Sequence, residues 1–253
     1  MKGLSVLQAY AGSDTPLTNA EIATRIALPR PTVSRLTATL VELGYLVRGT
    51  RGHFQVGARA LTLGYPVVSR YVDRQKARPF MREFAQRSGG AVSIAVASDM
   101  DYVFVESVRE THLMLHVPDV GFSAPLANTA MGRALLAAMP EVKLRQYRQR
   151  MMRFRPEEWR EHGEAAMAAI QECRANGFCG VFGTWRPEVL AVASPLGHTA
   201  NGEALAINCG LQSWMTTSEE ISEAKLGLRL AALARCIRDV MPLTLNSYPR
   251  EGA

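Results

Sequence analysis

Apolar residues recur every three or four positions along three stretches at the start of the chain. They lie within residues 4–10, in the stretch after Thr18, and within residues 31–43, and this spacing predicts three amphipathic helices. Thr18 and Glu21 have the spacing of a capping box, which predicts that the second helix begins there. Because only a tight turn fits between the second and third helices, we expect these two helices to pack against each other.

The third helix carries different side chains on its two faces. Val33, Leu36 and Leu40 form an apolar face, whereas Thr32 and Arg35 lie on another. Two short helices joined by a tight turn, the second with small polar residues and an arginine at its exposed start, are typical of a helix-turn-helix that enters the major groove of DNA. An arginine at such a position can donate two hydrogen bonds to a guanine.

Two strand-like runs follow this helix. Residues 45–48 and 53–56 surround a turn that contains Gly49 and Gly52, which predicts a β-hairpin of the kind that forms a wing. Arginines on a wing can contact the phosphates beside the recognition helix. The residues that we expect to contact DNA are Thr18, Arg30, Thr32, Ser34, Arg35, Thr39, Arg48 and Arg51.

The rest of the chain mixes strand-like and helical patterns. A connecting helix over residues 58–70 is expected to kink or break at Pro66. The order of the remaining elements predicts an antiparallel-rich α/β domain. We expect helices over 75–88, 128–138, 140–151, 156–176 and 219–241, and strands over 91–98, 102–108, 112–117, 178–182, 189–196 and 204–210.

Composition narrows the class of protein. With 47% hydrophobic and 21% charged residues, the chain of 253 residues is typical of globular proteins. No apolar run is long enough to span a membrane, and the N-terminus lacks the pattern of a signal peptide, so we expect a cytoplasmic protein. The four cysteines form no CxxC pair and share no zinc-binding spacing with histidine. We therefore expect reduced thiols, no metal and no cofactor.

Charge is spread unevenly along the chain. Residues 1–78 hold 11 Lys and Arg against 4 Asp and Glu, whereas the whole chain has a net charge of +6. The first third therefore carries +7 and the remainder −1. A basic first third favours a polyanionic partner, and together with the helix-turn-helix pattern it indicates double-stranded DNA.

Several of these motifs resemble the IclR family of bacterial transcription regulators. Residues 28–36 (LPRPTVSRL) and 40–46 (LVELGYL) are similar to the DNA-binding half of that family, and residues 54–57 (FQVG) are similar to the end of its wing. Residues 125–137 (PLANTAMGRALLA) resemble the TALGKALLA helix of the family's effector-binding domain, and residues 191–196 (AVASPL) resemble one of its strands.

The resemblance implies a fold class, an assembly and a function. It implies a homodimer or a dimer of dimers, and a small organic acid or related metabolite as effector. We therefore expect a transcription regulator, a repressor in preference to an activator, and not an enzyme. The implied fold is α+β, with an N-terminal winged helix-turn-helix at 1–57, a linker helix at 58–74, a GAF-like α/β effector-binding domain at 75–243 and a mobile tail at 244–253.

We expect the effector pocket between the helix of small residues and the sheet. An asparagine in a strand, such as Asn208, can donate and accept hydrogen bonds and so orient a carboxylate. Many IclR-family members carry an acidic residue where this chain has Val181, which suggests a more apolar or aromatic ligand. For the aliphatic residues, a place in the core is an equal alternative. The expected lining residues are Phe104, Ala130, Met131, Val181, Phe182, Trp185, Ala191 and Asn208.

Two other functions fit the same sequence. An enzyme with a DNA-binding appendage could use Ser194, Cys209 or a histidine, although the chain has no GxSxG, P-loop or HExxH motif. His112 and His116 could bind a metal from one side of a strand, but histidines on a solvated strand face are far more common. A winged helix that contacts protein is the other alternative, and the salt dependence of binding separates it from a DNA reader.

Overall fold

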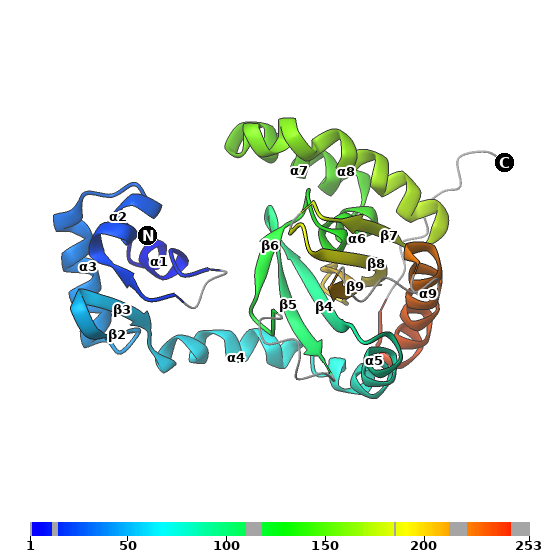
Figure 1. The fold of residues 1–253 in the computed structure, drawn as a ribbon, viewed down its shortest axis with the longest axis horizontal. Coiled ribbons are helices and arrows are strands. Elements are labelled where there is room, and N and C mark those ends of the chain that lie inside the picture. The colour runs from blue at the N-terminus through cyan, green and yellow to red at the C-terminus, as the bar shows by residue number, and fades with distance from the viewer. Residues whose placement is uncertain (1, 12–14, 110–117, 185, 213–221, 244–253) are drawn as a thin grey trace. The chain divides into compact units, whose positions relative to one another are not determined.

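A computed structural model gives the fold as two compact units, Met1–Tyr71 and Val72–Ala253, and each is described by itself (Figure 1). The structure describes residues 2–11, 15–109, 118–184, 186–212 and 222–243. The expected strand over 112–117 and the expected mobile tail over 244–253 therefore lie outside the described residues.

The first unit combines three helices with a small antiparallel sheet. Its sheet has the strand order β1-β3-β2, and its core takes one or more fully buried side chains from most elements, including Val6, Leu17, Ile22, Val33 and Leu46. The predicted helices and hairpin are present, whereas the two-residue strand β1 was not predicted. The elements are α1 (Lys2–Gln8), β1 (Leu17–Thr18), α2 (Asn19–Arg25), α3 (Arg30–Glu42), β2 (Leu46–Arg48) and β3 (His53–Val56).

The connecting helix differs from its expected form. A 3-10 turn, Ala58–Ala60, precedes α4 (Leu61–Arg70), and α4 continues through Pro66. Of the expected kink or break at Pro66, the break is therefore wrong, and the kink stays a prediction. No described side chain of α4 is buried, so the helix can accommodate the proline ring without displacing a core contact.

The second unit is built on a six-stranded sheet in which every pair of neighbours is antiparallel. The strand order is β6-β5-β4-β9-β8-β7. An antiparallel-rich α/β domain was predicted, but the edge strand β6 was not, because three residues give too short a pattern to detect. The strands are β4 (Ala91–Ser98), β5 (Asp101–Val108), β6 (Ser123–Pro125), β7 (Cys179–Phe182), β8 (Val189–His198) and β9 (Ala204–Gln212).

Helices cover both faces of this sheet, which explains why its central strands read as nearly continuous apolar runs. On one face Ala193 and Ala206 share a core cluster with α6. Their neighbours Val192 and Ile207 are also fully buried, on the face that α5 and α9 contact (Figure 1). The helices are α5 (Arg74–Ser88), α6 (Ala130–Ala138), α7 (Glu141–Phe154), α8 (Pro156–Asn176) and α9 (Glu223–Val240).

None of the described helices is both long and apolar enough to cross a bilayer.

Candidate DNA interface and effector cavity

The helix-turn-helix is fixed at its start by a capping box. The backbone N–H of Thr18 donates to Glu21 Oε2 at 2.7 Å, and the backbone N–H of Glu21 donates to Thr18 Oγ1 at 3.3 Å. Hydrogen bonds to the Glu21 carboxylate, first from the backbone N–H of Thr18 and then from its hydroxyl, lower the pKa of Glu21. The Thr18 hydroxyl also donates to Glu21 at 2.7 Å, so this predicted DNA contact already has a structural role in the cap.

A second polar contact sets α3 against α2. The side chain of Thr37 is buried, and its hydroxyl donates to Asn19 Oδ1 at 2.9 Å and to the carbonyl of Ser34 at 3.1 Å. A buried hydroxyl needs such partners, because leaving it without one costs about 1–3 kcal/mol. Thr37 was not predicted, although a threonine on the apolar side of an amphipathic helix is a detectable signal.

The opposite face of α3 is available to a partner. Arg30, Ser34, Arg35 and Thr39 are exposed and Thr32 is half-buried. Within the described part of the chain, no carboxylate forms an ion pair with either arginine. The Thr39 hydroxyl donates to the carbonyl of Arg35 at 3.1 Å. Arg35 therefore presents an exposed guanidinium, with no ion pair among the described residues, in the first half of α3, where a recognition helix contacts base edges.

The wing presents the other two predicted arginines. Arg51 sits at the tip of the hairpin with φ of 53°, and Gly52 follows with φ of 75°, so two left-handed residues turn the chain. The guanidinium of Arg48 lies 5.8 Å from the centre of the Phe54 ring, a cation–π distance. Both arginines are exposed, which gives the wing two cations for phosphate contacts.

A cavity of about 90 Å³ lies between the N-terminal end of α6 and the sheet. Six of the eight predicted residues line it: Phe104, Ala130, Met131, Val181, Ala191 and Asn208. Other lining residues were not predicted, and those with aromatic or polar side chains are Ser93, Tyr102, Phe122, Thr129, Arg186 and Gln212.

The remaining two predicted residues are not part of the described lining. Phe182 is 60% exposed and is absent from the cavity wall. Successive side chains of a strand point to opposite faces, so placing Val181 in the wall turns Phe182 outward. Trp185 lies outside the described residues.

The cavity combines aromatic walls with a few polar groups. The rings of Tyr102, Phe104 and Phe122 pack in tilted arrangements at centroid distances of 5.5 and 5.4 Å, and burial raises the pKa of Tyr102, which keeps its phenol neutral. Asn208 Oδ1 is buried and has no hydrogen-bond partner among the described residues. Arg186 is the one charged side chain in the described wall. A ring with an acidic group matches these properties.

The described wall contains no cysteine, histidine or carboxylate. The nucleophiles considered from the sequence lie elsewhere in other roles: Ser194 donates to the carbonyl of Gly177 at 2.7 Å, and burial raises the pKa of Cys209 to about 11. No group of His, Cys, Asp and Glu in the described part of the chain could hold a metal ion, and His112 and His116 lie outside that part. The arrangement is suited to binding a small molecule.

Comparisons with known proteins place both units in one family. Residues 1–49 match the IclR helix-turn-helix domain, and residues 67–238 match the bacterial transcriptional regulator IclR C-terminal domain. The chain belongs to the IclR family. It is 30% identical over 234 residues to the Pca regulon regulatory protein of Pseudomonas putida, covering 91% of this chain and 80% of that protein. The predicted family and fold class are confirmed, and the chain is a DNA-binding transcription regulator.

Solved structures of the IclR family have the same fold. An IclR-family regulator from Brucella abortus is 34% identical with a TM-score of 0.78, over 95% of this chain and 91% of that one. An IclR homologue from Microbacterium hydrocarbonoxydans, solved with 4-hydroxybenzoate, is 20% identical with a TM-score of 0.67, over 95% and 98% of the two chains. The relatives are named as transcription regulators, and this family relationship supports a non-enzymatic function.

Proposed function

We propose that this IclR-family protein is a repressor whose binding to an operator is controlled by a small aromatic acid held in the cavity of the second unit. The observation that carries the proposal is the cavity wall. It brings together three aromatic rings in mutual contact, Arg186, and the buried Asn208 oxygen that has no partner among the described residues. A ligand with a ring, a carboxylate and a hydrogen-bond donor would satisfy all three.

On the DNA side, α3 would lie in the major groove. Arg35 would donate to a guanine, and Thr32 and Ser34 would contact a base edge or a phosphate. Arg30 precedes them at the start of the helix, and the wing arginines would hold neighbouring phosphates. The exposure of this face supports the assignment.

Assembly as a homodimer, or as a dimer of dimers, would let two recognition helices bind one operator. Half-sites read by paired helices are about 34 Å apart, one turn of the double helix. A ligand that changes the relative placement of the two DNA-binding units would therefore change operator affinity. The IclR-family relatives named as repressors support repression.

Ligand binding to the full chain tests the cavity. We expect a thermal-shift screen of aromatic and short aliphatic acids to give upward shifts for aromatic acids, because a ligand that binds only the folded state stabilises it. The variant Met131→Trp fills the cavity and should lose the shift and the effect of the acid on operator binding, while still binding the operator. Met152→Trp, at an exposed position of α7, is the matched control.

Two results would count against the proposed effector class. A response that survives in Met131→Trp would place the ligand elsewhere. Shifts with aliphatic acids alone would remove the role of the aromatic wall. A circular dichroism spectrum like that of the wild type is required of each variant, and Asn208→Ala provides a smaller change at the same site.

A further inference from the structure

A row of polar side chains crosses the cavity floor and leads out of it. Antiparallel pairing sets Ser93 of β4 opposite Asn208 of β9 on one side and opposite Ser107 of β5 on the other. Ser93 and Asn208 line the cavity, and the Ser93 and Ser107 hydroxyl oxygens are 3.0 Å apart. The Ser107 hydroxyl also donates to the carbonyl of Pro118, another lining residue, at 3.4 Å. The row therefore connects the cavity wall to the end of β5.

Glu106 directly precedes Ser107, the last member of this row, but its side chain faces the side of the sheet away from the cavity. The register between β4 and β5 shifts, so that Glu106 is opposite Ile94 while Phe104 is opposite the next residue, Ala95. The shift leaves Val105 as an extra residue in β5, and such a bulge re-aims the side chains that follow it. Phe104 thus lines the cavity, whereas Glu106 points toward α5.

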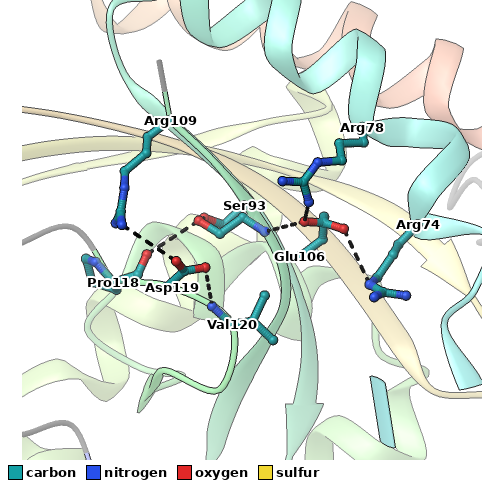
Figure 2. A network of polar contacts seen from close by, with 9 residues as sticks. Arg74, Arg78, Ser93, Glu106, Arg109, Pro118, Asp119 and Val120 are labelled. Atoms are coloured by element: carbon teal, nitrogen blue, oxygen red, sulfur yellow. Dashed lines mark hydrogen bonds and ion pairs between the residues drawn. The ribbon is translucent and has the colours of Figure 1, made fainter. Parts of the chain in front are cut away.

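The Glu106 carboxylate holds the start of α5. Its side chain is 3% exposed, and it lies 2.6 Å from Arg78 Nη1 and 3.4 Å from Arg74 Nε (Figure 2). It also accepts the backbone N–H of Ser107 at 3.1 Å. A buried carboxylate that loses its cationic partners is strongly disfavoured. Any shift of the end of β5 should therefore carry both arginines with it.

The helix that Glu106 holds directly follows the linker. Arg74 is the first residue of α5, and α4 ends at Arg70. Only residues 71–73 separate the clamped end of α5 from the helix that leads to the DNA-binding unit. The clamped start of α5 is thus joined to the end of α4 by three residues.

We propose that Glu106 is a positioning residue that couples occupancy of the cavity to the position of α5 and of the linker base. The inference rests on the proposed function of the cavity as a ligand site. A ligand that lies against Asn208 and hydrogen-bonds to Ser93 competes for the Ser93 hydroxyl and releases it from Ser107. The backbone of Ser107 then adjusts, and Glu106 moves α5 through its two arginines.

Hydrogen–deuterium exchange of the full chain, without any ligand, tests the coupling. Glu106→Gln keeps the size of the side chain and removes its charge, and we expect exchange at residues 78–82 to become about tenfold faster. Ser93→Ala, a change in the cavity wall, should raise exchange there by about threefold. If the two act through one network, the double variant should exchange no faster than Glu106→Gln alone.

Matched controls separate this coupling from general destabilisation. Ser98→Ala changes an exposed serine of the same strand, and Glu83→Gln removes a glutamate that pairs with Arg87 on the surface of α5; both should leave residues 78–82 unchanged. If Glu106→Gln does not fold, Ser107→Ala replaces it in the comparison of the two single variants with the double variant. Unchanged exchange in Ser93→Ala, or additive effects in the double variant, would overturn the proposal.

A second experiment separates a failure of this inference from a failure of the proposed function. With 4-hydroxybenzoate as the probe, Glu106→Gln should bind the acid within about twofold of the wild type but lose its effect on operator affinity. An effect equal to that in the wild type would overturn the role of Glu106. If the wild type does not bind the acid, that member of the proposed effector class fails, and the exchange cycle still decides the role of Glu106.

Discussion

Single polar side chains determine how the DNA-binding unit is assembled. The capping box of Thr18 and Glu21 was predicted from spacing alone, because both members lie within one turn of helix. The contact between Thr37 and Asn19 joins two helices across 18 positions, and spacing cannot reveal such a pair. The same limit applies to Arg186, whose place in the cavity wall depends on how β7 and β8 are paired.

The capping box makes the acid stability of α2 depend on Glu21. The pKa of Glu21 is lowered in the folded chain from its ordinary value of 4.5. The stabilisation of the folded chain by the ionised Glu21 carboxylate is therefore fully present above pH 4.5 and is lost as the pH falls through the lowered pKa. We expect Glu21→Gln to flatten this acid dependence.

Amide protection of α2, relative to intrinsic exchange rates, would be measured between pH 7 and pH 3. Glu42→Gln, at an exposed position of α3, is the control and should behave as the wild type. An unchanged pH profile in Glu21→Gln would show that the capping box does not contribute.

At the scale of elements, the sequence was most informative where periodicity and stop signals agree. The boundaries of α3 and of the wing strands were predicted within one or two residues, because Pro31, Gly44 and the apolar spacing all give the same limits. Pro66 was misleading, since a proline inside a helix lowers helix stability, but an exposed helix can tolerate it. The error at Phe182 arose because side-chain direction in a strand depends on register, which the sequence does not fix.

Close packing of α6 gives a test at the level of an element. All nine residues of α6 are buried, and a Cβ at Gly132 would overlap the backbone of Leu126, including its carbonyl oxygen. We expect Gly132→Ala to lower the free energy of unfolding by roughly 1–3 kcal/mol, as overpacking does. Because this end of α6 forms part of the cavity, ligand binding should weaken as well.

The matched change is Gly64→Ala in α4, where nothing lies within 4 Å of the added atom. There the free energy of unfolding should rise by about 0.5–1 kcal/mol, because alanine favours a helix over glycine. Urea unfolding of both variants measures the difference. Equal stability of Gly132→Ala and the wild type would contradict the close approach of α6 to Leu126.

The whole molecule divides its tasks between two units. The uneven charge of the chain indicated this division, with +7 in residues 1–78 and −1 in the remainder. The exposed arginines of α3 and the wing belong to the first unit, whereas the cavity belongs to the second. The linker joins the two units along the chain, and the Glu106 contacts lie at the start of α5, directly after it.

Operator binding by the full chain is the most direct test of DNA reading by α3. The operator would be selected from a random duplex pool with the wild-type protein, and its affinity measured by fluorescence anisotropy at several salt concentrations beside that of an unrelated duplex. Affinity should fall steeply with salt, because lysines and arginines displace counterions from phosphates. Arg87→Ala, a change in the second unit, is the control.

Arg35→Ala should weaken operator binding by about 1–3 kcal/mol, the value of one good base contact, and should change binding to the unrelated duplex much less. Arg87→Ala should leave both affinities unchanged. If Arg35→Ala binds the operator as tightly as the wild type, or loses the same factor on both duplexes, then Arg35 does not read the operator sequence.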